Sequence, residues 1–376
     1  MITRALLSNL VQHIHLQKVT VLLGARRVGK TALLKALAEA VDAQILWLNG
    51  EDADAAALLA DRSISNYKRL LAPYNLLIID EAQYLPDIGR KVKLMIDEVQ
   101  PLHIILTGSS AFSLSQEAGE PLVGRSITHH LYPIAQSELA QTESLLQTRQ
   151  QLPDRLIYGG YPELFALPEH SQKEAYLREL VQSYLLRDIL SFEAIRNPQK
   201  IQDLLKLIAH QVGAEVSLEE LGRKLQISKN TVERYLDLLT KVFVLYKRTG
   251  YSNNLRKEIT KSSRWYFYDN GIRNAVLQNF SPLVLRQDVG MLWENYVLAE
   301  RLKFQNYSGT AVNRFFWRTY DQQEIDLVEE REGRLTGYEL KFKPRGARVP
   351  AAFSKAYPEA VFEEISTENY LPFIGV

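Results

Sequence analysis

The segment from Val19 to Leu34, VTVLLGARRVGKTALL, constrains the fold of this chain more than any other stretch. An apolar run leads into a glycine-rich turn, and apolar residues at helical spacing follow. The turn has the pattern glycine, four residues, Gly-Lys-Thr, between a predicted strand and a predicted helix, as a phosphate-binding loop requires. Its glycines let backbone N–H groups curl around phosphates, and the amino end of the helix attracts their charge. The segment therefore predicts a nucleoside triphosphate site.

The loop predicts both a nucleotide and a metal ion. Lys30 is expected to reach the β- and γ-phosphates of ATP, and the Thr31 hydroxyl to take a Mg²⁺ position. The alternative is a glycine turn followed by an ordinary surface lysine. The nucleotide-binding residues we predict are Gly24, Ala25, Arg26, Arg27, Val28, Gly29, Lys30 and Thr31.

Two acids follow a second apolar run, Leu76 to Ile79. Continuous apolar runs are typical of parallel sheets that are covered on both faces, and ligands of such sheets bind at the carboxyl ends of the strands. We therefore expect Asp80 to hold Mg²⁺, directly or through water, and Glu81 to orient or deprotonate the attacking water. Without the upstream loop, the same pair would indicate the start of a helix.

A further buried strand is predicted over Leu102 to Leu106, followed by Thr107-Gly108-Ser109-Ser110. A polar residue there can touch the γ-phosphate or its water, or it can merely cap the next helix. Arg125, beyond this region, cannot easily reach the phosphate of its own chain. It is either supplied to a neighbouring subunit's γ-phosphate or is an ordinary surface arginine.

Composition limits the class of protein. A chain of 376 residues with 46% hydrophobic and 24% charged residues is expected to fold into two or three globular domains. It has no cysteine, which excludes disulfides and thiolate zinc sites, and it shows neither a signal peptide nor an apolar run that could span a membrane. A cytoplasmic location is the default expectation. With a net charge of +1, any DNA binding must come from local patches.

Helices replace the strand-helix alternation from about Leu156, and a more specific pattern follows over Ser217 to Thr249. Ser217 and Ser228 each begin a predicted helix, and Val242 to Tyr246 is predicted to be a strand. Helix, turn, helix and then strand, loop, strand is the order of a winged helix-turn-helix. The second helix would present Lys229, Asn230, Glu233 and Arg234, the candidate DNA contacts being Lys229, Asn230 and Arg234. The alternative is a winged domain that only packs between other domains.

The last quarter of the chain predicts a cluster of acids. A two-residue hairpin loop at Glu332-Gly333 would place Asp326 opposite Glu339, with Lys341 on the same face. Two facing carboxylates repel each other unless something offsets them, and a divalent cation would do so. Carboxylates that hold Mg²⁺ beside a lysine suit phosphodiester cleavage. A Glu-x-Lys pattern also occurs freely on exposed strands.

The whole chain resembles the bacterial and archaeal AAA-type ATPases that join an N-terminal P-loop domain to a C-terminal restriction-endonuclease-like domain of unassigned function. The resemblance covers nearly the full length. It rests on LLGARRVGKTALL, LLIIDEAQYLP, IILTGSS, LVGRSITHHLYPIAQSEL, YGGYPE, ISKNTVERYLDLL, YFYDNGIRNAV, LWENYVLAERL, EIDLVEE and YELKFK.

The resemblance implies roles for residues at both ends of the chain. Ser109 or Ser110 would sense the γ-phosphate, and Arg125 would be the arginine finger of an adjacent subunit. Glu294, Asp326, Glu339 and Lys341 would match the PD-(D/E)xK nuclease core, with Glu294 as the helix acid and with Asp326 and Glu339 as metal ligands.

These patterns predict an α/β fold with four parts. They are an AAA-type P-loop domain with a parallel sheet (residues 1–145), a helical lid (146–212), a winged helix-turn-helix (213–280) and a nuclease-like α/β domain (281–376). The expected function is ATP-dependent action on DNA, for example on branched recombination intermediates, by a homo-oligomer such as a hexameric ring. The alternatives are a nucleotide-controlled switch that gates a protein partner, and a nuclease that uses ATP only for assembly.

Overall fold

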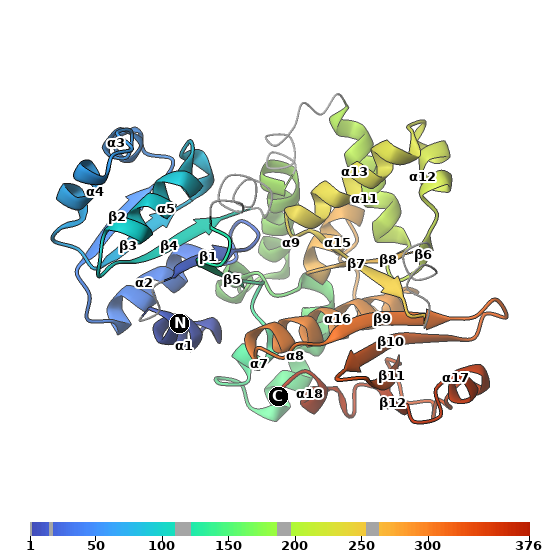
Figure 1. Cartoon of the computed structure of the whole chain (residues 1–376). Helices are drawn as coiled ribbons and strands as arrows, with labels where there is room; N and C mark the ends of the chain where they lie inside the picture. The colour runs from blue at the N-terminus through green and yellow to red at the C-terminus, as the bar shows by residue number, and fades with distance from the viewer. Residues whose placement is uncertain (1, 15–17, 110–121, 186–196, 253–262) are drawn as a thin grey trace. The chain divides into compact units, whose positions relative to one another are not determined.

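A computed structural model describes residues 2–14, 18–109, 122–185, 197–252 and 263–376 of the chain (Figure 1). It divides into two compact units. Unit 1 comprises Met1–Tyr132 and Lys241–Phe243, and unit 2 comprises Pro133–Thr240 and Val244–Val376. The predicted boundaries at 145/146, 212/213 and 280/281 remain predictions.

Unit 1 is built on a parallel sheet, as the sequence predicts. Within the described residues it has five strands in the order β2-β3-β4-β1-β5. The strands are β1 (Val19–Leu23), β2 (Ile45–Asn49), β3 (Leu76–Asp80), β4 (His103–Gly108) and β5 (Ser126–His130). Every residue of β1, β3 and β4 is buried, because these strands are central and both faces of the sheet are covered. The α/β fold class is confirmed.

Helices cover both faces of this sheet. They are α1 (Leu6–His13), α2 (Lys30–Ala40), α3 (Ala53–Leu58), α4 (Ile64–Leu71), the 3₁₀ turn η1 (Ala82–Tyr84) and α5 (Ile88–Glu98). α1 packs against α2, and α4 packs against α5 (Figure 1). Right-handed crossovers place α2 on one face of the sheet and α4 and α5 on the other, and α1 lies against α2. Between β2 and β3 the chain forms the two helices α3 and α4, and Ser63 caps the second of them.

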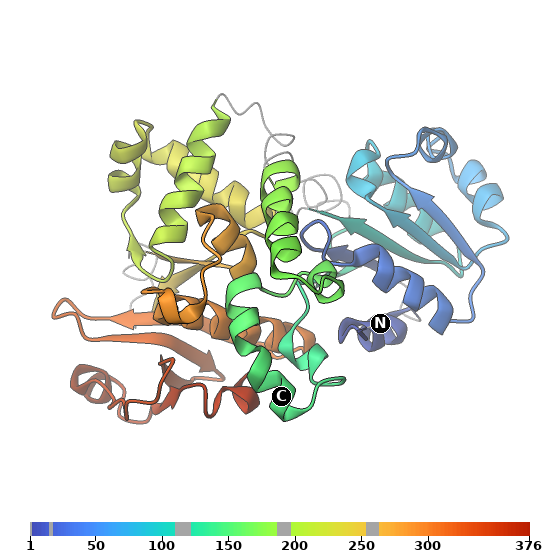
Figure 2. The ribbon, with the colours of Figure 1, turned by 180° about the vertical axis from the view of Figure 1, so that it is seen from behind.

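The first part of unit 2 is helical. Its elements are α7 (Gln136–Leu139), α8 (Leu145–Tyr158), η2 (Pro162–Ala166), α9 (His170–Glu179), the π-helix η3 (Leu180–Leu185) and α11 (Pro198–His210). α15 (Asn270–Leu277) packs against α8, α9 and α11 (Figure 2). The helical segment that begins with α9 continues through η3 to Leu185, where the described part of the chain pauses until residue 197.

The elements expected of a winged helix follow α11 in the predicted order. They are β6 (Glu215–Val216), α12 (Leu218–Leu225), α13 (Lys229–Lys241), β7 (Leu245–Gly250) and β8 (Ser263–Phe267). The Ser217 hydroxyl accepts from the Glu220 N–H, and that of Ser228 accepts from the Thr231 N–H, so both predicted caps are confirmed. The strand predicted over 242–246 was placed too early. Phe243 has φ +59°, so the buried apolar residues before Leu245 form a turn after α13.

A second sheet joins these strands to the end of the chain. Within the described residues it has seven strands in the order β12-β11-β10-β9-β7-β8-β6. Its remaining strands are β9 (Asn313–Arg318), β10 (Glu324–Arg331), β11 (Arg334–Leu340) and β12 (Val361–Ile365), and the remaining helices are η4 (Leu283–Leu285), α16 (Val289–Tyr307), α17 (Ala351–Ala356) and α18 (Tyr370–Phe373). β7 pairs in parallel with β9, so the strands on the two sides of residue 280 form one sheet.

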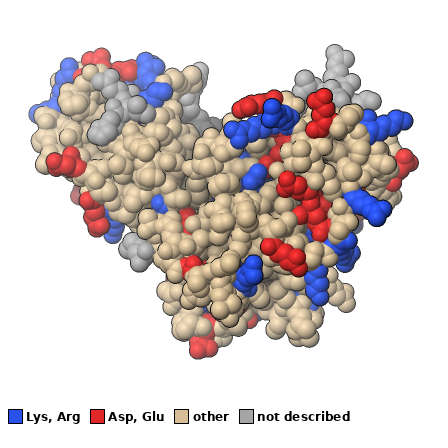
Figure 3. Space-filling view, turned by 90° about the horizontal axis from the view of Figure 1, so that it is seen from below, with Lys and Arg blue, Asp and Glu red and all other residues tan. Residues whose placement is uncertain are grey.

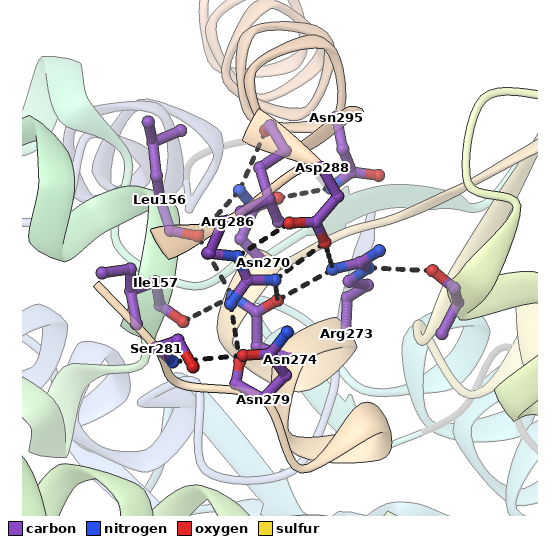
Figure 4. Close-up of polar contacts among 12 residues, drawn as sticks. Leu156, Ile157, Asn270, Arg273, Asn274, Asn279, Ser281, Arg286, Asp288 and Asn295 are labelled. Atoms are coloured by element: carbon purple, nitrogen blue, oxygen red, sulfur yellow. Dashed lines mark hydrogen bonds and ion pairs between the residues drawn. The ribbon is translucent and has the colours of Figure 1, made fainter. Parts of the chain in front are cut away.

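A buried polar network holds α15 in place (Figure 4). The side-chain amide of Asn274 donates to the carbonyl oxygens of Leu156 and Ile157, at the end of α8. Arg273 and Arg286 both donate to Asp288, which directly precedes α16. The network thus ties α8, α15 and the start of α16 together. No helix in the described ranges is both long and apolar enough to span a membrane.

Candidate functional site

The phosphate loop connects β1 to α2 at the carboxyl edge of the first sheet. Gly24 lies so close to the chain after β5 that an added Cβ would be 2.2 Å from the Leu131 carbonyl oxygen. Gly29, the N-cap of α2, has φ +95°, a backbone conformation that glycine adopts without strain. Both glycines of the predicted motif are therefore required by the local geometry. The amino end of α2 begins directly at Lys30.

Lys30 is buried, and its ammonium group faces back into the loop. Nζ donates to the carbonyl oxygens of Gly24 at 2.9 Å and Ala25 at 3.1 Å, and it lies 4.0 Å from Oε1 of Glu81. The side chain is thus held over the loop, where phosphate oxygens can replace the carbonyls as acceptors. The contact of Lys30 with the β- and γ-phosphates remains a prediction.

Thr31 and Asp80 meet at the carboxyl end of β3. The Thr31 hydroxyl donates to Oδ2 of Asp80 at 2.7 Å, and the Thr107 hydroxyl donates to Oδ1 at 2.5 Å. Adjacent ligand oxygens of an octahedral Mg²⁺ ion are about 2.9 Å apart. The oxygens of Thr31 and Asp80 therefore fit one Mg²⁺ ion, and these two residues would hold it.

Glu81 directly follows β3, whose last residue is Asp80. Its φ is +50°, and its N–H donates to the Thr107 hydroxyl at 2.9 Å, so the chain turns sharply after Asp80. An added Cβ on Gly50, at the end of β2, would be 2.3 Å from the Glu81 carbonyl oxygen. The close approach of β2 therefore helps to fix this turn, which directs the Glu81 side chain toward Lys30.

Gln83 connects Glu81 with Ser109, and the sequence analysis missed it. Its side-chain amide donates to Oε2 of Glu81 at 2.5 Å and to the hydroxyl of Ser109 at 3.3 Å. Ser109 is buried directly after β4, whereas Ser110 lies outside the described residues. The only sequence signal for Gln83 is its position two residues after Glu81. The structure thus brings Lys30, Glu81, Gln83 and Ser109 together.

The other residues of the loop are fixed by neighbours in unit 1. Arg26 donates to the Tyr84 hydroxyl at 2.6 Å, and Arg27 has φ +60°. The carbonyl oxygen of Val28 accepts from Arg4 at 2.6 Å, and Arg4 also donates to the carbonyl oxygen of Tyr132. Arg4, from the start of the chain, is thus a second supporting residue that the sequence analysis missed.

Arg125 lies at the opposite edge of the sheet from the phosphate loop. It directly precedes β5, whose first residue pairs with Val19 at the amino end of β1. The length of β1, roughly 16 Å for five residues, separates it from the loop. Its Nε donates to Asp97 at 2.8 Å, and its side chain is 43% exposed. Arg125 is therefore remote from its own phosphate loop, and its role in an adjacent subunit remains a prediction.

The outward face of α13 carries charges of both signs. Lys229, Asn230, Glu233 and Arg234 are all exposed, as predicted. Lys229 pairs with Glu219 of α12 at 2.6 Å, and the Arg234 guanidinium lies 5.8 Å from the ring centroid of Tyr235. The opposite side of the molecule, which Figure 3 shows from below, also has basic and acidic side chains interspersed. The exposed face of α13 is therefore mixed in charge rather than strongly basic.

The predicted hairpin brings the acids of the C-terminal region together. Arg331 pairs with Arg334 across Glu332-Gly333, and Leu327 pairs with Tyr338, so the register places Asp326 opposite Glu339. Oδ2 of Asp326 accepts from the Leu340 N–H at 2.9 Å. Lys341 forms an ion pair with Glu339 at 2.6 Å. Burial, followed by the charge of Asp326, raises the pKa of Glu339, and burial also raises the pKa of Asp326.

Glu294 of α16 joins this acid cluster, which we define as Glu294, Asp326 and Glu339. Its Oε1 accepts from the Tyr266 hydroxyl of β8 at 2.7 Å. Burial, with the nearby charge of Asp326, raises the pKa of Glu294 to about 8. Arg264 of β8 lies 4.0 Å from Oδ1 of Asp326 and 2.8 Å from Glu324. Among the described residues, no group of three or more His, Cys, Asp or Glu side chains is arranged to hold a metal ion.

Comparison with protein families finds a described domain in the first third of the chain. Residues 16–140 match an AAA domain. The matched segment contains the five-stranded parallel sheet, the phosphate loop and the Thr31–Asp80 contact. Residues 149–283 and 289–366 each match a family described as a domain of unknown function.

Relatives extend over most of the chain. An uncharacterized protein of Mycobacterium tuberculosis is 28% identical over 333 residues, covering 87% of this chain and 71% of that protein. An uncharacterized protein of Haemophilus influenzae is 26% identical over 362 residues, and the match covers 90% of this chain and 86% of the Haemophilus protein. The matched segments in both extend beyond the AAA domain into the region of the acid cluster.

Solved structures give distant matches. The Aeropyrum pernix ORC1 protein in complex with DNA is 12% identical with a TM-score of 0.32, covering 73% of this chain and 91% of that one. The Thermotoga maritima RuvB Holliday junction branch migration motor is 16% identical with a TM-score of 0.32, covering 66% of this chain and 90% of that one.

Proposed function

We propose that this protein hydrolyses ATP with Mg²⁺ and couples hydrolysis to an action on DNA. The observation that carries the first part is the convergence of Lys30, Thr31, Asp80 and Glu81 at one edge of the parallel sheet. Lys30 would neutralise the β- and γ-phosphates, while Thr31 and Asp80 would hold Mg²⁺. Bound Mg²⁺ would offset the charge that develops on the phosphate oxygens.

Glu81 is the candidate for activating water, and its neighbours position it. Its backbone is fixed by the Thr107 hydroxyl, and one carboxylate oxygen accepts from Gln83. The other oxygen lies 4.0 Å from Lys30, so it faces the place where the γ-phosphate would lie. Ser109, which Gln83 connects to Glu81, would sense that phosphate. Arg125 would act on the nucleotide of an adjacent subunit in a homo-oligomer such as a hexameric ring.

The second part of the proposal concerns DNA. The helices α12 and α13, with β7 and β8, have the order of a winged helix-turn-helix, and Lys229, Asn230 and Arg234 are exposed on α13. The acid cluster and Lys341 would form a nuclease-like site, where Asp326 and Glu339 would hold a divalent cation. Branched DNA such as recombination intermediates is the substrate class that we propose.

A second function, a nucleotide-controlled switch that gates a protein partner, is favoured by one observation. Lys229 already pairs with Glu219, and Lys224 pairs with Glu220, so much of the positive charge near α13 is balanced within the protein. In this case the winged segment would only pack, and the chain would hold ATP, hydrolyse it slowly and ignore DNA.

Steady-state ATP hydrolysis distinguishes these functions. Wild type, Glu81→Gln and Lys30→Ala are assayed without DNA and with linear duplex, single strand or a four-way junction, each at two salt concentrations. Salt is varied because phosphate contacts weaken steeply as it rises. Stimulation by one form of DNA, absent from Glu81→Gln, supports the proposal. Equal rates with and without every DNA would favour the switch, and no hydrolysis by wild type under any condition would reject both ATPase functions. If the protein is a nuclease that uses ATP only for assembly, the Glu81→Gln variant should still cut DNA. The Asp326→Ala variant should then lose DNA cleavage.

A further inference from the structure

Arg248 of β7 is buried without a counter-charge in contact. Only 2% of its surface is exposed, and its Nη1 atom has no hydrogen-bond partner. Its guanidinium lies 5.1 Å from the ring centroid of Tyr266 and 5.9 Å from that of Tyr246. Within the described residues, no carboxylate forms an ion pair with it. Because burying an unpaired charge is costly, such a residue points to a partner that arrives from outside.

A second buried arginine lies directly across the ladder. Arg248 pairs with Arg264 of β8, so the two side chains share one face of the sheet. Like charges directly opposite each other are destabilising unless something offsets them. Arg264 has carboxylates nearby, since it pairs with Glu324 and lies 4.0 Å from Asp326. Its Nε is nevertheless buried without a hydrogen-bond partner.

The arginines belong to the same polar group as the acid cluster. Tyr266 follows Arg264 by two residues on the same face, and its hydroxyl donates to Glu294. The group reaches the surface at Glu324 and Lys341, whose side chains are 47% and 34% exposed. Glu324 and Glu339 have basic partners of their own in Arg264 and Lys341. Glu294 lies near enough for the Arg248 charge to favour its ionised form, but no carboxylate among the described residues forms an ion pair with Arg248.

We propose that Arg248, assisted by Arg264, binds a phosphate group of a nucleic acid backbone beside the acid cluster. A guanidinium offers a planar fork of donors that matches two phosphate oxygens, and the rings of Tyr246 and Tyr266 hold this one in place. The inference rests on the proposed action on DNA. It makes the paired strands β7 and β8, which fall within the predicted winged segment, part of the site that contains the acids.

The test uses the full chain with Arg248→Met and Arg248→Lys. Arg318→Met is the matched control, because Arg318 lies on the neighbouring strand β9 and is already paired with Glu215 at 3.1 Å. Binding of fluorescein-labelled duplex and four-way junction is measured by anisotropy over a range of salt. Thermal unfolding is measured without DNA, and again with inorganic phosphate. ATP hydrolysis without DNA should be unchanged, because Arg248 lies in unit 2.

Arg248→Met should move stability and binding in opposite directions. Replacing a buried unpaired charge with an apolar side chain should raise the midpoint of thermal unfolding by roughly 2 °C or more. The same change should weaken DNA binding about tenfold. It should also reduce the slope of the logarithm of the DNA-binding constant against the logarithm of the salt concentration by about 0.9. Arg248→Lys should keep part of the affinity, and Arg318→Met should bind DNA like wild type.

Three results would overturn the inference. If Arg248→Met lowers the unfolding midpoint and leaves DNA affinity unchanged, the arginine is structural. If inorganic phosphate raises the midpoint of wild type more than that of Arg248→Met while the variant binds DNA normally, the site takes free phosphate instead of nucleic acid. If wild type binds no DNA at any salt concentration, the proposed action on DNA fails first, and the inference falls with it.

Discussion

Arg286 and Asp288 form a two-pronged ion pair, with Nε 2.8 Å from Oδ1 and Nη2 2.8 Å from Oδ2 (Figure 4). Arg273 donates to the same Oδ2 atom at 2.5 Å, so one carboxylate serves two buried arginines. Burial opposes the ionisation of Asp288. The hydrogen bonds from Arg286 and Arg273 outweigh this effect and lower its pKa from 3.8 to about 2. The start of α16 is thereby fastened to α15.

Asp288→Asn should destabilise unit 2 by roughly 3 kcal/mol at neutral pH, because it leaves two buried guanidinium groups without a carboxylate. Urea denaturation followed by tryptophan fluorescence measures this, since Trp265, Trp293 and Trp317 all lie in unit 2. Asp321→Asn is the control, because Asp321 is exposed. Equal loss of stability in both variants would contradict the prediction.

The same ion pair should depend on pH in a defined direction. The pKa of Asp288 is lower in the folded protein than in the unfolded chain, so its stabilising effect is complete above the ordinary pKa of 3.8. The effect is lost as the pH falls through about 2. The stability difference between wild type and Asp288→Asn should therefore shrink below pH 3.8, and a difference that grows there would be inconsistent with the ion pair.

Gly50→Ala should impair ATP hydrolysis more than ATP binding. The new methyl group would overlap the Glu81 carbonyl oxygen, at 2.3 Å, and displace the residue that activates water. We expect kcat to fall roughly tenfold to a hundredfold, while the Kd for ATP changes little. Gly290→Ala is the control, because a Cβ there meets nothing within 4 Å. A variant that loses ATP binding instead would show that Gly50 supports the loop rather than Glu81.

Arg125→Ala and Glu81→Gln should each be inactive alone and partly active when mixed. In a mixed oligomer, an Arg125→Ala subunit keeps its own Glu81 and receives Arg125 from a Glu81→Gln neighbour. The roughly 16 Å that β1 places between Arg125 and its own loop motivates this prediction. ATP hydrolysis across a series of mixing ratios measures it. Full activity of Arg125→Ala by itself would remove the arginine from the mechanism.

His129 should make unit 1 less stable in mild acid. Its Nε2 lies 3.0 Å from Nδ1 of His13, and burial, with the charges of His13 and His130, lowers its pKa from 6.5 to about 4. Between these values the unfolded chain takes up a proton that the folded protein does not, so stability falls as the pH decreases. Hydrogen exchange of the β5 segment at about pH 7.5 and about pH 5, corrected for the intrinsic rate, measures this. The loss of protection should be smaller in His129→Gln and unchanged in His210→Gln, a substitution of an exposed histidine.

Local patterns were sufficient for much of the fold and for the centre of the ATP site. The run Val19–Leu23 is β1 without any shift, because five buried apolar residues before a glycine turn leave little choice of structure. The hairpin at Glu332-Gly333 formed in the expected register, because a two-residue loop sets the pairing of its strands.

What the sequence could not predict depends on contacts between distant segments. Gln83 becomes important only because Glu81 and Ser109, from different strand ends, meet beside it. In the sequence Arg248 is an ordinary strand residue, and its position opposite Arg264 depends on the pairing of β7 with β8. The strand around Phe243 was placed too early. The turn residues before Leu245 are buried and apolar, so their sequence has the same pattern as a buried strand.

The pairing of β7 with β9 also affects how this chain can be divided. Thr249 and Gly250 align with Phe315 and Phe316, and the Tyr251 N–H donates to the Phe316 carbonyl oxygen at 2.7 Å. The regions that match two separate families, 149–283 and 289–366, therefore share one hydrogen-bonded ladder. A fragment that stops at residue 280 would expose β7 as an open edge, which invites aggregation. We therefore expect recombinant expression to yield folded protein only when the regions 149–283 and 289–366 are kept together. The same should hold when these regions are exchanged between genes.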